Sequence, residues 1–182
     1  MRLLVAVVVV VALVTLALVY NSLVRRRNLV ADGWAGIDVQ LARRADLVPN
    51  LVATVRAYRD FERTTLEGVT KARAELLSGS GPAGKARADQ ALTGSLKTLF
   101  AVSEAHPDLK ADASFLALQL ELATLEEDIS FARRYYNARV RKFNEAQQSF
   151  PSLLVARPMG FRPAEYFLAD ADHRSTPEAR LA

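Results

Sequence analysis

Residues 109–149, LKADASFLALQLELATLEEDISFARRYYNARVRKFNEAQQS, lie in the longest stretch of this chain without glycine or proline. Apolar side chains recur through the stretch at steps of three and four residues, which is the period of one face of an α-helix. The pattern predicts a long amphipathic helix, and such a stripe is typical of a bundle core rather than of a cofactor site. The stripe consists of Phe115, Leu118, Leu122, Leu125, Ile129, Ala132, Tyr136, Val140, Phe143 and Phe150.

Helix-breaking residues outside this stretch mark two more helical regions. A cluster of three glycines and one proline lies between residues 79 and 84, and Pro107 precedes the long stretch. We therefore expect helices over roughly 29–77 and roughly 85–105. Because no alternating apolar and polar run follows the first 24 residues, the predicted fold is all-α, with three to four helices in a long antiparallel, coiled-coil-like bundle.

The first of these regions contains a proline within its apolar stripe. Pro49 has no backbone N–H, and its ring crowds the carbonyl of Ala45. Since apolar residues continue at helical spacing on both sides, we expect a kink near Pro49 rather than the end of the helix. The stripe consists of Val30, Trp34, Ile37, Leu41, Val48, Leu51, Val55, Tyr58, Leu66 and Val69.

The first 24 residues form an apolar leader. Leu3–Val19 contains a single polar residue, Thr15, and its length approaches the roughly 20 residues that cross a bilayer. The alternative is a cleaved signal peptide, whose apolar region usually has about 7 to 15 residues followed by a small-x-small cleavage site. Residues 19–22 offer no such site. We therefore interpret the leader as an uncleaved transmembrane helix.

Arginines flank this leader unequally. Arg2 precedes it, whereas Arg25, Arg26 and Arg27 follow it directly. Cations near a span tend to stay in the cytoplasm, so we expect a single-pass protein with a cytoplasmic C-terminal domain. The same three arginines are candidate contacts for lipid headgroups. The predicted organisation is an anchor over 1–24, a basic juxtamembrane linker over 25–28, a helical bundle over 29–169 and a disordered tail over 170–182.

Polar residues lie beside both apolar stripes at helical spacing. Charged and amide groups between helices must satisfy one another, so they fix register and partner choice. We expect Asp46 or Asp38 to pair with Arg133, and Asn137 and Asn144 to hydrogen-bond to a neighbouring helix. The alternative is that these side chains are solvated at the edges of the stripes. The candidate interhelical network consists of Asp38, Arg43, Asp46, Asn50, Glu126, Arg133, Asn137 and Asn144.

The expected helices differ in length, so the short middle helix cannot cover both long ones. The part of the first helix nearest the membrane, with Trp34, Ile37 and Leu41, then needs another partner. Either the proline-rich segment after residue 150 folds back over it as a strap, or a second subunit covers it. The second alternative makes these three residues a candidate self-association face and predicts a homo-oligomer.

The residue inventory leaves little room for catalytic chemistry. The chain has no cysteine and two histidines, and no Glu-x-x-His pair occurs, so we expect neither a metal site nor a cofactor. The acidic run Glu126–Asp128 points in three directions around a helix, which favours solvated charge over a metal site. The net charge of +4 does not predict a nucleic-acid partner, because the arginines are scattered and the dense run adjoins the leader.

A set of short motifs is spread over nearly the whole chain. It consists of Tyr20–Asn21, Asn28, Trp34, Ile37–Leu41, Arg43–Arg44, Asp46–Val52, Glu104, Pro107, Leu109, Glu126, Ile129, Ala132–Arg133, Tyr136–Asn137, Val140, Phe143–Asn144, Phe150–Pro151, Gly160–Phe161 and Phe167. In these motifs the chain resembles the LemA family. Gly36 and Phe143 depart from the usual pattern, in which the first is a small polar residue such as serine and the second a tyrosine.

The resemblance implies a bacterial protein anchored in the inner membrane, with a long helical bundle after one N-terminal span. It implies no enzymatic activity and no catalytic residue, and a magnetosome-associated branch of the family is linked to organelle formation. We therefore expect a non-enzymatic scaffold that self-associates or docks other membrane or cytoplasmic proteins. The alternatives are a membrane-shaping or envelope-stress component and, least favoured, a metal-dependent enzyme.

Overall fold

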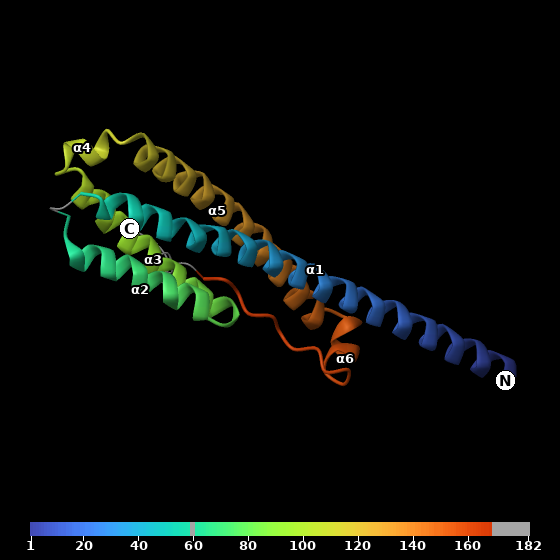
Figure 1. Ribbon diagram of the computed structural model, residues 1–182. Coiled ribbons are helices and arrows are strands. Elements are labelled where there is room, and N and C mark those ends of the chain that lie inside the picture. Colours follow the sequence, from blue (N-terminus) through green and yellow to red (C-terminus); the bar gives the residue numbers. More distant parts are fainter. Residues whose placement is uncertain (59–60, 169–182) are drawn as a thin grey trace, which may run out of the picture. The chain divides into compact units, whose positions relative to one another are not determined.

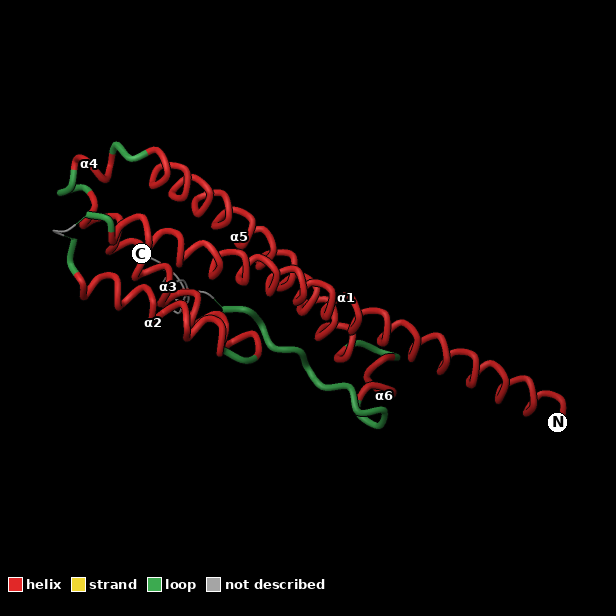
Figure 2. Tube along the Cα trace, in the orientation of Figure 1, coloured by secondary structure: helices red, strands yellow, loops and turns green. Residues whose placement is uncertain are grey.

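A computed structural model describes residues 1–58 and 61–168 of the chain. Within these residues there are helices and connecting segments but no β-strand, which confirms the all-α prediction (Figure 2). The predicted tail at 170–182 lies outside the described residues. The helices are α1 (Arg2–Arg56), α2 (Arg63–Ser78), α3 (Gly81–Ser103), α4 (Pro107–Lys110), α5 (Ala113–Gln148) and α6 (Ser152–Ala156) (Figure 1).

The chain divides into two compact units that both draw on the long helices. Unit 1 contains residues 1–40 and 127–166, and unit 2 contains residues 41–126 together with 167 and 168 of the described part. α1 and α5 each contribute residues to both units. The basic segment 25–28 is an uninterrupted part of α1.

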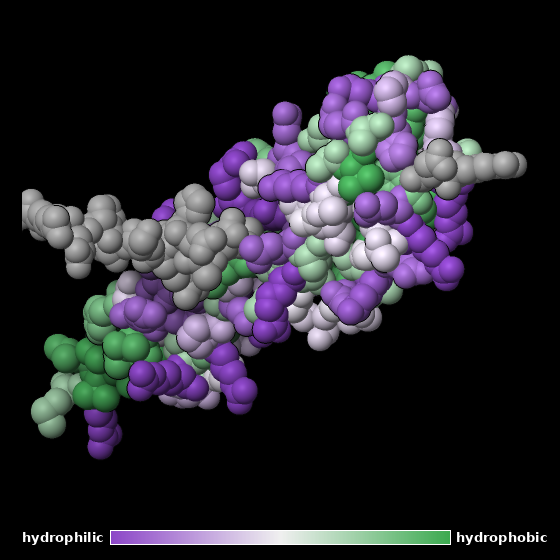
Figure 3. All heavy atoms as spheres, turned by 90° about the vertical axis from the view of Figure 1, so that its left-hand side faces the viewer, coloured by the Kyte–Doolittle hydropathy of each residue, from purple (hydrophilic) through white to green (hydrophobic). Residues whose placement is uncertain are grey.

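The beginning of α1 is apolar and exposed. It contains an 18-residue window with a mean hydropathy of 3.1, of which no part is buried, so α1 is long and apolar enough to cross a membrane. On the face drawn in Figure 3, strongly hydrophobic residues are concentrated at the lower left, whereas hydrophilic residues cover much of the rest. An exposed apolar helix of this length is typical of a membrane span, in which side chains meet lipid instead of protein.

α1 continues through Pro49 as one 55-residue helix. Because Pro49 has no N–H, the carbonyl of Ala45 four residues earlier loses its helical donor. In unit 2 the Nε–H of Arg73 on α2 donates to this oxygen at 2.7 Å. A side chain from the neighbouring helix thus replaces the missing backbone bond. The kink expected near Pro49 stays a prediction.

The expectation of one helical region over 29–77 is wrong, because α1 ends at Arg56 and α2 begins at Arg63. No glycine or proline marks the reversal. Contacts with a later part of the chain fix it instead: the hydroxyl of Tyr58 donates to Asp112 Oδ2 at 3.2 Å, and the buried Phe61 ring lies 5.4 Å from the His106 ring. Burial, followed by the charge of Asp112, raises the pKa of Tyr58.

The other two predicted helices also begin elsewhere. α3 starts at Gly81, about four residues before the expected position, with a proline in its first turn, where the missing N–H costs nothing. The expected helix from residue 109 is divided into α4 and α5. Asp112 lies between them, and its Oδ1 accepts the N–H of Phe115 at 2.9 Å, so it caps the start of α5.

The core of unit 2 lies between α1, α2, α3 and α5. Large side chains with 3% exposure or less line it, and the Phe100 and Phe115 rings of α3 and α5 meet edge to face at 6.0 Å. Apolar burial on this scale is the main source of stability in a helical domain. The core includes Val48, Leu51, Val55, Val69, Leu76, Leu92, Leu96, Leu99, Leu109 and Phe115.

In unit 1 the segment after α5 folds back along the same helix, and a strap over Trp34, Ile37 and Leu41 of α1 stays a prediction. Asn144 Nδ2 donates to the Ala164 carbonyl at 2.9 Å, and its Oδ1 accepts the Ala164 N–H at 2.8 Å. The Tyr136 hydroxyl donates to the Glu165 carbonyl at 2.7 Å. The buried Phe161 ring lies 6.4 Å from the Phe143 ring. This segment therefore belongs to the core of its own chain.

Candidate functional site

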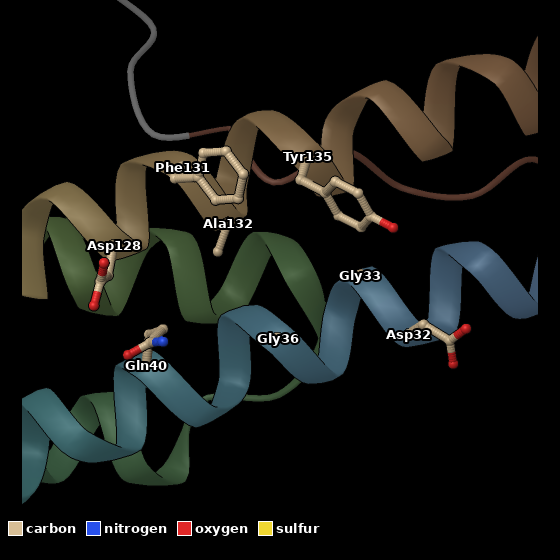
Figure 4. A pocket seen from close by; sticks show the side chains of 8 residues that line it. All are labelled: Asp32, Gly33, Gly36, Gln40, Asp128, Phe131, Ala132 and Tyr135. Carbon is tan, nitrogen blue, oxygen red and sulfur yellow. The ribbon is translucent and has the colours of Figure 1, made fainter.

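A shallow groove of about 290 Å³ lies between α1 and α5 in unit 1 (Figure 4). Two of the residues that line it are glycines. A Cβ on Gly33 would lie 3.3 Å from the Tyr136 Cα, so this glycine permits the close approach of the helices, whereas a Cβ on Gly36 would meet nothing within 4 Å. The groove is lined by Asp32, Gly33, Gly36 and Gln40 of α1 and by Asp128, Phe131, Ala132 and Tyr135 of α5.

The α5 wall of the groove is aromatic and accessible. The Phe131 side chain is 65% exposed and that of Tyr135 is 38% exposed. Arg139 fixes Tyr135, because its guanidinium lies 4.6 Å from the ring centroid and donates to the hydroxyl at 2.9 Å. Exposed aromatic side chains held in this way are typical of protein interaction surfaces.

Polar groups complete the groove. The buried Oε1 of Gln40 has no hydrogen-bond partner, and Figure 4 shows Gln40 and Asp128 extending from facing helices at one end. Asp32 and Asp128 are both exposed carboxylates. The groove thus combines apolar walls with two exposed carboxylates and an unsatisfied amide oxygen, which suits an apolar side chain that carries or adjoins a hydrogen-bond donor.

Unit 2 contains a buried charge cluster that the sequence prediction missed. Arg44 is 4% exposed, and its Nη1 lies 2.9 Å from Asp89 Oδ1 on α3 and 2.8 Å from Glu126 Oε2 on α5. Asp89 is 1% exposed. The signal was present, because Arg44 falls three residues after Leu41 and four before Val48 on the apolar stripe. The cluster joins three helices, and its role is structural.

The predicted network is only partly interhelical. Its four α1 members, Asp38, Arg43, Asp46 and Asn50, are exposed. Arg43 was the wrong arginine, since its neighbour Arg44 is the one that faces the core. For Arg43, Asp46 and Asn50 the solvated alternative describes the side chains better, whereas Asp38 has an interaction partner.

The α5 members of the network are half-buried. Glu126 pairs with Arg44, and Asn144 bonds to the backbone of Ala164 rather than to a neighbouring helix, so that expectation is wrong. The returning segment lies closer to Asn144 and offers both a donor and an acceptor. Arg133 and Asn137 both have interaction partners, and the pairing of Arg133 with an aspartate of α1 stays a prediction.

The candidate self-association face is covered within the chain. Ile37 and Leu41 are 0% and 1% exposed, and Trp34 is half-buried with its ring 5.8 Å from the Tyr136 ring. The prediction of this face is wrong because α5 packs on the same stripe of α1. Two exposed aromatic residues of unit 1, Phe131 and Tyr135, lie instead at the groove.

The predicted lipid contacts can also be placed in the structure. Arg25, Arg26 and Arg27 are exposed, as lipid contacts require, although lipid binding stays a prediction. Among residues 1–58 and 61–168 no three His, Cys, Asp or Glu side chains are grouped to hold a metal ion.

One tyrosine under the returning segment has an altered ionisation. Burial, followed by the nearby Glu165 carboxylate, raises the pKa of Tyr136 to about 12. Its side chain is 2% exposed and its hydroxyl is a hydrogen-bond donor. The neutral form is therefore the one that the fold stabilises.

The fold and these surfaces define a class of protein: an all-helical protein that has, within its described residues, one candidate membrane span and an open groove between two helices. The sequence profile of the LemA family matches residues 33–180, and this chain belongs to the LemA family. The resemblance drawn from its motifs is thereby confirmed.

Three relatives extend this assignment. The chain is 25% identical to Protein LemA of Metamycoplasma hominis over 158 residues, which cover 85% of this chain and 71% of the relative. It is 25% identical to Magnetosome protein MamQ of Magnetospirillum gryphiswaldense over 179 residues, covering 84% and 66%. Magnetosome protein MamQ 2 of Paramagnetospirillum magneticum is 24% identical over 185 residues, covering 87% and 68%.

Proposed function

We propose that this protein is a non-enzymatic, membrane-anchored interaction protein whose helices after the apolar beginning of α1 lie on the cytoplasmic side of the bacterial inner membrane. The observation that supports this most is α1, whose exposed apolar beginning continues without a break into charged helices. The three arginines after the apolar segment support the orientation, because such clusters stay on the cytoplasmic side.

Membrane extraction tests the anchor. We expect the natural chain to stay with bacterial membranes after an alkaline wash. The double variant Val8→Arg/Val10→Arg places two charges in the span, each costing about 3 kcal/mol at the centre of a bilayer, and should be released. Val39→Arg is the matched control, since Val39 is exposed on α1 outside this segment. Release of the natural chain, or retention of the double variant, would contradict the anchor.

The groove supports the interaction part of the proposal. Its exposed Phe131 and Tyr135 are the groups that a second copy or another protein would cover. Because the chain has no cysteine, Phe131→Cys provides a single site for crosslinking in membranes. We expect dimers from this variant and few from Leu77→Cys, an exposed position on α2. Equal yields from both positions would contradict self-association at the groove.

A second candidate function is membrane shaping. It is supported by the MamQ relatives, which are named as magnetosome proteins. In this case the purified chain should deform or cluster liposomes that contain anionic lipid, as seen by electron microscopy. Unchanged liposomes at high protein density would leave the interaction function as the better description.

A further inference from the structure

A second element of unit 1 lies beside the end of the apolar segment of α1. The Phe161 ring meets the Tyr20 ring edge to face at 5.7 Å, and the Arg27 guanidinium lies 5.6 Å from the centroid of Phe161. We call residues 150–162, which include α6, the α6 segment. Figure 1 shows α6 beside α1, with the beginning of α1 extending beyond it.

The backbone of the α6 segment holds Phe161 in this position. Gly160 has a φ of +75°, which glycine adopts readily and other residues rarely do. The Phe161 N–H donates to the Ala156 carbonyl at 2.9 Å, and the Gly160 N–H donates to the Arg157 carbonyl at 3.1 Å. These are the two bonds of a Schellman turn. The turn returns the chain toward α1, so the segment is fixed at the level of Tyr20.

The outer side of the α6 segment is apolar. Val155 and Ala156 are buried, whereas four large neighbours are exposed: Phe150 at 82%, Leu154 at 66%, Met159 at 52% and Leu153 at 41%. Four large apolar side chains within ten residues of one short segment are unusual on a surface that only meets water. They need a surface of matching chemistry.

The charge of this region indicates what that surface is. Residues 146–164 contain Arg157 and Arg162 and no acidic residue, and residues 1–31 contain the arginines at 25–27 and no acidic residue. Arg157 and Arg162 are exposed. Exposed cations without acids beside exposed apolar side chains match the boundary of an anionic bilayer, where arginines meet headgroups and apolar groups enter the acyl boundary.

The position of the segment agrees with this partner. The apolar part of α1 gives way to arginines between Tyr20 and Arg25, and a tyrosine at the end of a span lies at the membrane–water boundary. Phe161 packs on Tyr20, so the α6 segment lies at the same boundary. A protein partner would have to bind at headgroup level, where lipid is already present.

We propose that the α6 segment is a second membrane contact, which inserts Leu153, Leu154 and Met159 into the interface of the anionic leaflet while Arg157 and Arg162 bind headgroups. This proposal rests on the proposed anchor. The contact adds a second attachment point beside α1, so the part of unit 1 that follows the span is held against the membrane surface instead of pivoting on the single span.

Fluorescence quenching in vesicles tests this contact. The full chain, free of cysteine, is reconstituted into vesicles of phosphatidylcholine and phosphatidylglycerol after labelling Leu154→Cys with an environment-sensitive dye. Lipids with a nitroxide near the headgroup should quench this label several-fold more than a label at Leu120→Cys, which is 70% exposed on α5. Circular dichroism confirms that each labelled chain is folded.

A label at Val10→Cys separates the two proposals. Quenching at position 10 by deep nitroxides without quenching at 154 would overturn the α6 contact and leave the anchor intact, whereas no quenching at position 10 would overturn the anchor itself. Removing phosphatidylglycerol, or introducing Arg157→Gln with Arg162→Gln, should reduce quenching at 154 and leave position 10 unchanged. Equal quenching at 154 under all these conditions would overturn the headgroup role of the two arginines.

Discussion

Unit 2 buries a guanidinium between carboxylates from two other helices, whereas in unit 1 two polar side chains hold the returning segment through hydrogen bonds to its backbone. The ion cluster of unit 2 is expensive to disturb, because the charges of Arg44 and Asp89 are shielded from water. The contacts of unit 1 are individually weaker and can be lost one by one. This difference predicts that substitutions lower the unfolding free energy by graded amounts, and by more in unit 2 than in unit 1.

The largest effect is expected from the centre of the unit 2 cluster. Arg44→Ala leaves the 1% exposed carboxylate of Asp89 without the guanidinium, and breaking a buried pair on one side costs about 3–5 kcal/mol. Chemical denaturation measures this loss. The double variant Arg44→Met/Asp89→Leu should recover much of the stability, because it removes both charges together. A loss below about 1 kcal/mol for Arg44→Ala would be typical of an exposed pair. It would contradict the claim that the ion cluster of unit 2 costs more to disturb than the contacts of unit 1.

The next effect concerns the proline inside α1. Arg73→Ala removes the donor to the Ala45 carbonyl, and an unsatisfied buried carbonyl costs about 1–3 kcal/mol. Pro49→Ala restores a backbone N–H for the same oxygen. We therefore expect Arg73→Ala to cost less in the Pro49→Ala background than in the natural chain, as a double-mutant cycle would measure. Equal costs in both backgrounds would show that Arg73 does not replace the missing bond.

A smaller effect is expected in unit 1. Asn144→Ala removes both hydrogen bonds to Ala164, and we expect a loss of about 1 kcal/mol, since each such bond contributes about that amount at most when part-exposed. Proteolysis should become faster within residues 161–168, because they lose their attachment to α5. Asn144→Asp keeps the acceptor and loses the donor, so its effect should be intermediate. Unchanged proteolysis in Asn144→Ala would mean that the aromatic contacts alone hold the segment.

The smallest effect is confined to high pH. Because the pKa of Tyr136 is raised to about 12 from an ordinary value of 10.0, its contribution to stability is complete below pH 10 and is lost as the pH rises through 12. The unfolding free energy of the natural chain should therefore fall more between pH 9 and 11.5 than that of Tyr136→Phe. Ultraviolet absorbance of tyrosinate follows the ionisation. Parallel pH curves for the two proteins would contradict the buried position of this hydroxyl.

The sequence predicted the helical class and the apolar stripes, because periodicity depends on which side chains face a core. It missed the reversal after Arg56, because this turn has no glycine or proline and depends on Tyr58 and Phe61 contacting residues some 45 to 55 positions later. The local pattern of apolar and polar residues carries no information about such contacts. Glycine and proline did mark the turn between α2 and α3, and there the predicted helix boundaries lie within about four residues of the observed ones.

The polar residues also show what the local sequence pattern does not predict. Arg43 and Arg44 are adjacent, and one-residue steps on a helix turn by about 100°, so a small error in the assumed stripe exchanged the buried arginine for the exposed one. The partner of Arg44 on α3, Asp89, stands among alanines and leucines and could have been noticed there. The bonds from Asn144 to Ala164 depend on how the chain returns after α6, which no periodicity describes.

The central claim is that the first part of α1 crosses a membrane and the charged helices that follow lie in the cytoplasm. Cysteine scanning along α1 with a membrane-impermeant maleimide tests it most directly, one position at a time from residue 3 to residue 28, in intact cells and in opened membranes. The account predicts no labelling from 3 to 19 in either preparation, and labelling at 25–28 only after the membranes are opened. Labelling throughout 3–19 would contradict the anchor, and labelling at 25–28 in intact cells would reverse the orientation.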